Sequence, residues 1–130
     1  MKINKILQVV LAIFIPYILI MAGVRIVMTP NFPAFEYKRE SFPADPFGFT
    51  VQERTKWSGY AVSYLTNDED IDYLGNLQDL NGQKMFTPDE LAHMVDVKDV
   101  VKASSIAWYV LSGISIAILI WFIVMRQWES

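Results

Sequence analysis

The chain contains a single histidine, His93, which lies between two carboxylates at helical spacing. On a helix, Asp89 four residues before it and Asp96 three residues after it can both face the imidazole ring. Such neighbours favour the charged ring and can orient one ring nitrogen, as a general base requires. His93, with Asp96 or Asp89, is therefore the candidate for proton-transfer chemistry. The alternative is a solvated histidine on a polar helix surface.

Metal chemistry has little support in the sequence. Asp68, Asp70 and Asp72 alternate as in a calcium-binding EF-hand loop. However, Tyr73 stands where that loop needs glycine, and Asp79 stands where it needs a bidentate glutamate. One histidine and no cysteine also leave no zinc-type spacing. We therefore expect no metal and no cofactor, and a solvated helix start at the acidic segment.

Two apolar segments near the ends of the chain set its class. They cover residues 6–24 and 106–125, each close to the roughly 20 residues that an α-helix needs to cross a bilayer. The sequence therefore predicts an all-α membrane protein with two transmembrane helices and a small helical extracytoplasmic domain between them. We expect a signal-anchor helix in residues 1–28, the loop domain in 29–103, and the second helix with a short cytoplasmic tail in 104–130.

The charges beside the apolar segments predict the orientation. Lys2 and Lys5 precede the first segment and Arg126 follows the second, whereas the loop has a net charge of −6. Short basic flanks stay in the cytoplasm, while a long loop is translocated largely regardless of its charge. We expect both termini in the cytoplasm and residues 29–103 outside it. The acidic loop has no basic stripe, which argues against nucleic-acid binding. A cleaved signal peptide is the alternative for the first segment, but no clear A-x-A site follows it.

The loop begins with a segment rich in proline and phenylalanine, residues 29–50. This composition predicts neither a helix nor a central strand. We expect an irregular segment whose aromatic side chains pack on neighbouring helices or enter the membrane interface. Thr50 and Glu53 then form a capping box, which starts a helix that ends near Leu65.

The second half of the loop carries a stronger helix signal. A short helix is expected through residues 71–77. Thr87 and Glu90 form another capping box with proline at the first helical position. No proline or glycine follows until Gly113, so this helix is predicted to run straight into the second span and to end near Trp128.

The second apolar segment offers surfaces for contact with other membrane components. Ser112, Gly113, Ser115 and Ala117 form a patch of small residues, in which Gly113 and Ala117 have the spacing that permits close helix approach. Tryptophans near the segment ends fit interfacial aromatic belts. Packing against the first helix is the alternative. The residues expected to contact partner subunits or lipid are Ser112, Gly113, Ala117, Trp108, Trp121 and Trp128.

Several runs of residues keep the order and spacing of one known family. They are 41–50 (SFPADPFGFT), 53–54 (ER), 64–65 (YL), and Phe86 followed by 90–98 (ELAHMVDVK). With these runs the chain resembles the bacterial lipoprotein intramolecular transacylase family over most of residues 1–102. The resemblance implies a helical loop domain seated on a bundle in the bacterial plasma membrane. It also implies that His93 matches the family's loop histidine, proposed to act in acyl transfer.

Family members move an acyl chain from the glyceryl group of the lipid-modified cysteine to its α-amino group, without a metal or soluble cofactor. They have four membrane helices, and the second half supplies further polar residues of the active site. The present sequence has two apolar segments and one histidine. Enclosing a lipidated substrate needs walls on several sides, which two helices do not supply alone.

The sequence therefore favours a non-enzymatic interpretation, a two-span accessory or structural subunit of a larger integral membrane complex, for instance an energy-converting one. Its partners would be other integral membrane subunits, with lipid, lipoprotein or pigment as further candidates. The alternative is a lipoprotein intramolecular acyltransferase that acts as a homo-oligomer or with a partner. In that case His93 is the general base, Asp96 orients it, and Arg54 holds an anionic or ester oxygen. Arg54 could instead pair with Glu53 or Asp45.

Overall fold

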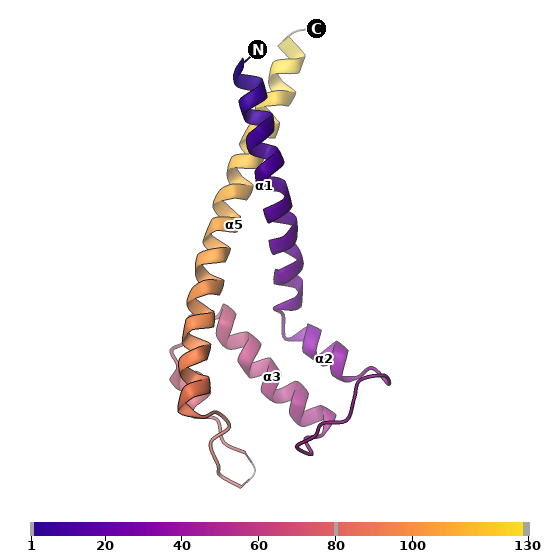
Figure 1. Ribbon diagram of the computed structural model, residues 1–130, viewed down its shortest axis with the longest axis vertical. Helices are drawn as coiled ribbons and strands as arrows, with labels where there is room; N and C mark the ends of the chain where they lie inside the picture. Colours follow the sequence, from indigo (N-terminus) through magenta and orange to yellow (C-terminus); the bar gives the residue numbers. More distant parts are fainter. Residues whose placement is uncertain (1, 80, 129–130) are drawn as a thin grey trace. The chain divides into compact units, whose positions relative to one another are not determined.

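The computed structural model describes the backbone of residues 2–79 and 81–128, and the side chains of residues 3–79 and 81–125. Within this part of the chain the secondary structure is helical, and one isolated antiparallel bridge pairs Gln78 with Lys84. The molecule is an all-α membrane protein, as the sequence predicts. The helices in Figure 1 are α1 (Lys2–Val27), α2 (Asn31–Tyr37), α3 (Val51–Thr66), α4 (Asp72–Gly75) and α5 (Pro88–Trp128).

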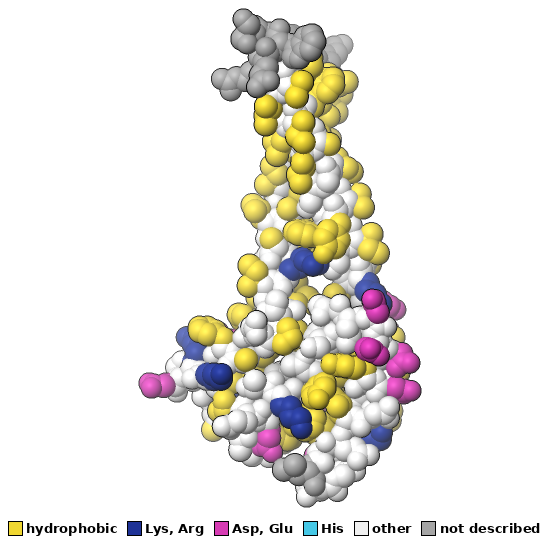
Figure 2. Space-filling view, turned by 180° about the vertical axis from the view of Figure 1, so that it is seen from behind, with side chains coloured by type: hydrophobic (Ala, Val, Ile, Leu, Met, Phe, Trp, Pro, Cys, Tyr) yellow, Lys and Arg dark blue, Asp and Glu magenta, His cyan; other side chains and the backbone are white. Residues whose placement is uncertain are grey.

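The chain forms two compact units, one from Met1–Val24 with Ala103–Ser130 and the other from Arg25–Lys102. Both long helices have the length and composition to cross a membrane: an 18-residue stretch within Ile3–Val27 has a mean hydropathy of 2.4, and one within Pro88–Met125 has a mean hydropathy of 2.2. In Figure 2, hydrophobic side chains cover the two long helices, and the visible Asp and Glu side chains lie on the second unit. This distribution suits hydrocarbon around the first unit and water around the second.

The first unit is held together by a narrow seam between α1 and α5. Only Leu11, Ser115 and Ile118 are buried among its described side chains. The hydroxyl of Tyr17 donates a hydrogen bond to the carbonyl oxygen of Ser104 over 3.1 Å. The indole nitrogen of Trp108 donates one to the carbonyl oxygen of Ile18 over 3.0 Å. Side-chain bonds of this kind support helix pairs where the hydrophobic effect is weak.

The prediction that residues 29–50 contain no helix was wrong for α2. This helix follows α1 after three residues and includes Pro33 in its first turn. An amide in the first turn has no acceptor within the helix, so proline costs no hydrogen bond there. The residues after α2 are irregular up to α3, as the composition predicts.

The helix α3 begins at the predicted capping box. The amide of Glu53 donates to the hydroxyl of Thr50 over 3.2 Å, and the amide of Thr50 donates to the Glu53 carboxylate over 2.8 Å. These bonds favour the ionised carboxylate. The amide of Thr50 and then its hydroxyl hold the pKa of Glu53 below its ordinary value of 4.5.

We therefore expect the capping box to give the loop domain a measurable acid dependence. Because the pKa of Glu53 is lower in the folded chain, its stabilisation is present above pH 4.5 and is lost as the pH falls through the folded-state pKa. A Glu53→Gln variant keeps an acceptor but does not titrate, so its melting temperature should fall less between pH 7 and about pH 3.5. Circular dichroism in detergent measures this. Glu40→Gln is the control, and a Glu53→Gln melting curve with the wild-type pH dependence would contradict the assignment.

The segment between α3 and α5 contains one short helix and is stabilised by hydrogen bonds from main-chain amides to side chains. The expected short helix is confined to Asp72–Gly75. A turn precedes α5, with Gly82 at φ +78°. The carboxylate of Asp79 accepts the amides of Asn81 and Gln83, each over 2.8 Å.

The last helix, α5, is continuous over 41 residues, as predicted. Its capping box is formed, since the amide of Glu90 donates to the hydroxyl of Thr87 over 3.3 Å and the amide of Thr87 donates to the Glu90 carboxylate over 2.8 Å. Gly113 does not interrupt it. One helix therefore carries both the histidine and the second apolar segment.

Candidate functional site

The structure places His93 and both flanking carboxylates on the exposed surface of α5, within its first three turns. Within the described part of the chain, His93 makes no hydrogen bond or ion pair with another side chain. Its imidazole is therefore accessible to a group that the chain itself does not supply. The helical spacing from Asp89 and Asp96 is as predicted, but neither carboxylate is locked onto the ring.

The structure places Arg54 in the first turn of α3, against aromatic rings. Its Nη1 donates to the carbonyl oxygen of Pro43 over 3.0 Å. The guanidinium carbon lies 5.1 Å from the ring centroid of Tyr37 and 5.4 Å from that of Phe42. The Nε atom is buried and has no acceptor among the described residues. Such stacking suits arginine, whose planar cation is weakly hydrated.

The suggested ion pairs of Arg54 with Glu53 or Asp45 are not formed. The Glu53 carboxylate is occupied by the capping box. The Asp45 carboxylate accepts the amides of Phe47 over 2.8 Å and Phe49 over 3.0 Å, which shapes the turn before α3. No carboxylate in the described parts of the chain pairs with Arg54, which remains a cation stacked on aromatic rings.

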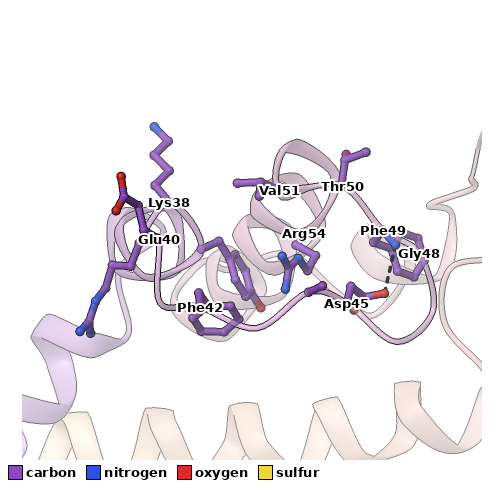
Figure 3. Close-up of a pocket in the computed structure, with 12 residues that line it drawn as sticks. Lys38, Glu40, Phe42, Asp45, Gly48, Phe49, Thr50, Val51 and Arg54 are labelled. Atoms are coloured by element: carbon purple, nitrogen blue, oxygen red, sulfur yellow. Dashed lines mark hydrogen bonds between the residues drawn. The ribbon is translucent and has the colours of Figure 1, made fainter.

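Arg54 lines an open pocket of about 750 Å³ between α2, the following loop and the start of α3. Figure 3 shows its side chain directed toward the loop that carries Phe42 and Asp45, with Lys38 and Glu40 extending outward at the rim. The lining residues are Tyr37, Lys38, Arg39, Glu40, Phe42, Ala44, Asp45, Gly48, Phe49, Thr50, Val51 and Arg54.

The structure does not bring Arg54 to His93. The histidine is absent from the pocket lining. The contacts of α5 with α3 lie at the other end of α3, where Lys98 meets Tyr64. Arg54 and Tyr64 are ten residues apart, about 15 Å along a helix. A single reaction centre containing both His93 and Arg54 is therefore not assembled by this chain alone.

Sequence reasoning missed Lys98, which is 5% exposed. Its ammonium group lies 3.9 Å from the ring centroid of Tyr64, donates to Asn67 Oδ1 over 3.1 Å, and also donates to the carbonyl oxygen of Glu69. The signal was present, because Lys98 follows Leu91 and Met94 on one helical stripe that is otherwise apolar. A lysine in such a stripe indicates a buried cation with partners from elsewhere.

Lys98 belongs to the core of the second unit. Tyr64 is 2% exposed, and Leu74 in α4, which packs against α3, is fully buried. The ring of Tyr73 stacks on Tyr64 with centroids 6.5 Å apart. Burial, followed by the charges of Asp99 and Asp70, raises the pKa of the Tyr64 hydroxyl, which therefore stays neutral. The cation joins α5 to the residues just after α3, through the Asn67 side chain and the Glu69 carbonyl oxygen.

Replacing Lys98 by alanine should destabilise the loop domain by about 2 kcal/mol, because the Glu69 carbonyl and the Asn67 amide lose their shared donor. Lys102→Ala is the matched control on the same helix. Lys102 is half exposed and lies 3.8 Å from the Asp68 carboxylate, so it should cost at most about 1 kcal/mol. Denaturant unfolding followed by circular dichroism compares the two, and equal losses would contradict the buried role of Lys98.

The acidic segment shows no sign of a metal site in the described residues, where no three potential ligands lie together. The Asp70 carboxylate instead accepts the amide of Asp72 over 3.0 Å. The carboxylates therefore serve the turn and α4.

The small-residue patch of α5 divides between two surfaces. Ser115 is buried and Ser112 is half-buried, and neither hydroxyl has a hydrogen-bond partner among the described residues. Gly113 and Ala117 are exposed, with open space where a Gly113 side chain would lie. Trp121 is 47% exposed. Trp108 is half-buried on α1 rather than turned fully outward, and the side chain of Trp128 lies outside the described residues.

The model of the lipoprotein intramolecular transacylase family, Lit, matches residues 9–130. The chain belongs to this family. The match confirms the resemblance and extends it through the apolar part of α5. A relative in Aquifex aeolicus (strain VF5), described as an uncharacterized protein, is 32% identical over 114 residues, which cover 88% of this chain and 53% of the relative. The transacylase-family chain thus spans about half the length of that relative. No solved structure matches it significantly.

Proposed function

We propose that this chain takes part in intramolecular acyl transfer on membrane lipoproteins, with His93 as its proton-transferring group. The family match carries the proposal, because it spans the loop domain and both membrane helices. The exposed position of His93 on α5 supports it, since the imidazole is accessible to a substrate. This ranks the enzymatic interpretation above the accessory one.

The proposed reaction needs no oxidant, metal or co-substrate. The α-amino nitrogen of the lipidated cysteine attacks the carbonyl carbon of a glyceryl ester. A carbon–nitrogen bond forms, and the bond from that carbon to the glyceryl oxygen breaks. The amine loses a proton and the glyceryl oxygen gains one. His93 suits both transfers, because one ring nitrogen of an imidazole can accept a proton while the other donates one. Asp96 would orient the ring.

The two membrane helices leave most of their apolar surface available to further helices. Ile13 and Ile20 on α1 and Ile116 on α5 are each more than half exposed. Helices from a second copy or another chain would cover this surface and would supply walls that exclude water from the reacting ester. We place the loop outside the cytoplasm, because Lys2 and Lys5 flank the first apolar segment.

The deciding experiment compares lipoprotein N-termini with and without this chain. The protein is expressed in a bacterial host that has no other means of acylating the α-amino group of lipoproteins. Because the transfer is intramolecular, the lipopeptide mass stays constant, so mass alone decides nothing. We expect the α-amino group to become blocked to an amine-reactive reagent, and tandem mass spectrometry to place one acyl chain on nitrogen. A free amine at the same level with and without the chain would reject the proposal.

The second candidate function is a non-catalytic subunit of a membrane complex. It is favoured by the exposed pair Gly113 and Ala117, whose spacing permits close approach of another helix. Gentle detergent extraction followed by sizing tests it. Migration as a 14.9 kDa monomer would count against this role, whereas fixed-ratio purification with larger subunits, without acyl transfer, would favour it.

A further inference from the structure

The Arg54 pocket is tethered to the end of a membrane helix. The last turn of α1 and the whole of α2 belong to the same compact unit. Only residues 28–30 separate Val27 from Asn31, so an extended chain spans at most about 14 Å between them. The helix α2 supplies Tyr37 to the pocket wall. Tyr37 in the pocket wall therefore follows the end of α1 by only ten residues of chain.

The surface around this pocket exposes large apolar side chains. Phe35 on α2 is 65% exposed, and Phe47 in the following loop is 86% exposed. Ile26, in the last turn of α1, is 68% exposed. Phenylalanines exposed to this extent are poorly accommodated in water but are stabilised at the boundary between headgroups and acyl chains. The covering layer that these residues indicate is the membrane surface itself, because Ile26 belongs to the membrane helix α1 and Phe35 follows the end of that helix by eight residues.

Arg54 gives the pocket a cation that is not paired with a carboxylate among the described residues, although Glu40 and Asp45 also line the pocket. Arg54 has no carboxylate partner in the described part of the chain, and its buried Nε has no acceptor. Tyr37 and Phe42 fix the plane of the guanidinium. The exposed ammonium of Lys38 stands at the rim (Figure 3). A planar cation held in this way matches phosphate oxygens, which arginine binds through paired hydrogen bonds.

We propose that this pocket binds the phosphate of a phospholipid headgroup, with Arg54 as the principal cation and with Phe35 and Phe47 inserted in the membrane interface. The binding seats the loop domain on the membrane at a defined depth. This goes beyond acyl transfer, because the pocket does not contain His93 and the bound phospholipid undergoes no reaction.

Lipid titration of the full chain tests the proposal. The chain is purified in detergent, and binding of phosphatidylglycerol is followed by native mass spectrometry. Arg54→Met should weaken binding about tenfold or more, because a charge-assisted bond to phosphate is lost. Lys56→Gln is the matched control. It removes one positive charge from the same helix, but Lys56 lies on Trp57 outside the pocket, so binding should stay within about twofold. Equal weakening by both variants would show general charge attraction and would overturn the proposal.

A second experiment uses the wild-type chain, so the proposal can be tested even if the Arg54→Met variant does not fold. A phospholipid with a photoreactive headgroup should label residues 35–54 in nanodiscs. Unlabelled phosphatidylglycerol should compete, whereas diacylglycerol and millimolar inorganic phosphate should not. Competition by diacylglycerol would indicate an acyl-chain site, competition by inorganic phosphate would indicate a free-anion site, and labelling elsewhere would remove the pocket from consideration. Each of these results overturns the proposal.

Binding of the phospholipid headgroup can be tested independently of the proposed acyl transfer. His93→Ala should leave headgroup labelling unchanged. Loss of labelling with intact acyl transfer would reject this inference alone, and normal labelling without acyl transfer would reject the proposed function alone.

Discussion

Replacing His93 by alanine should abolish acyl transfer while leaving the fold intact. The side chain is exposed on α5 and makes no hydrogen bond or ion pair with the described residues that would be lost on truncation. Removing a general base from a proton-transfer step lowers rates by about 100-fold to 10,000-fold. The rate at which the lipoprotein α-amino group becomes blocked measures this, with circular dichroism as the check on folding.

Two further variants on the same helix make this prediction specific. Asp96→Asn should slow the reaction by about tenfold, because it weakens the orientation and the charge of the imidazole. Asp99→Asn removes an equal charge one turn further along and should change little. A His93→Ala protein that retains the wild-type rate would show that His93 is not the proton-transferring group.

Replacing Leu74 by alanine should cause the largest loss of stability in the loop domain. This side chain is fully buried in α4, which packs against α3. Truncation of a buried leucine removes packing and leaves a cavity, at a cost of about 3 kcal/mol. Denaturant unfolding in detergent, followed by the fluorescence of Trp57 in α3, reports on this domain.

Val95→Ala provides the comparison for Leu74→Ala. Val95 is 37% exposed on α5, so its truncation should cost less than about 1 kcal/mol. A Leu74→Ala protein as stable as Val95→Ala would mean that the core of the loop domain lies elsewhere.

Local signals in the sequence predicted most of the helix boundaries. The capping boxes at Thr50 and Thr87 fix the starts of α3 and α5 through contacts within four residues. These helix starts can therefore be predicted from the local sequence, without knowledge of the tertiary structure. The continuity of α5 follows from the absence of proline and glycine before Gly113. The prediction failed at α2 because the proline content of residues 29–50 does not say where a helix would begin. Pro33 falls in the first turn of α2, where a proline does not disrupt the helix.

The arrangement of the site was less predictable, because it depends on contacts between distant segments. Arg54 was expected near the reaction centre or paired with a carboxylate, and the structure instead stacks it on Tyr37 and Phe42. Lys98 was part of a family motif, yet its burial follows from the end of α3 reaching α5. Residue spacing along a single helix predicts neither the stacking of Arg54 nor the burial of Lys98.

The two bonds across the membrane seam end on main-chain oxygens, those of Ser104 and Ile18. A peptide oxygen is present whatever amino acid occupies the position. A substitution at 104 or 18 therefore leaves the main-chain acceptor of that bond in place, whereas both donors are side chains, one phenol and one indole. Substituting Tyr17 and Trp108 together should remove both bonds and weaken the pairing of the two helices, whereas Ile18→Leu should keep the acceptor for Trp108.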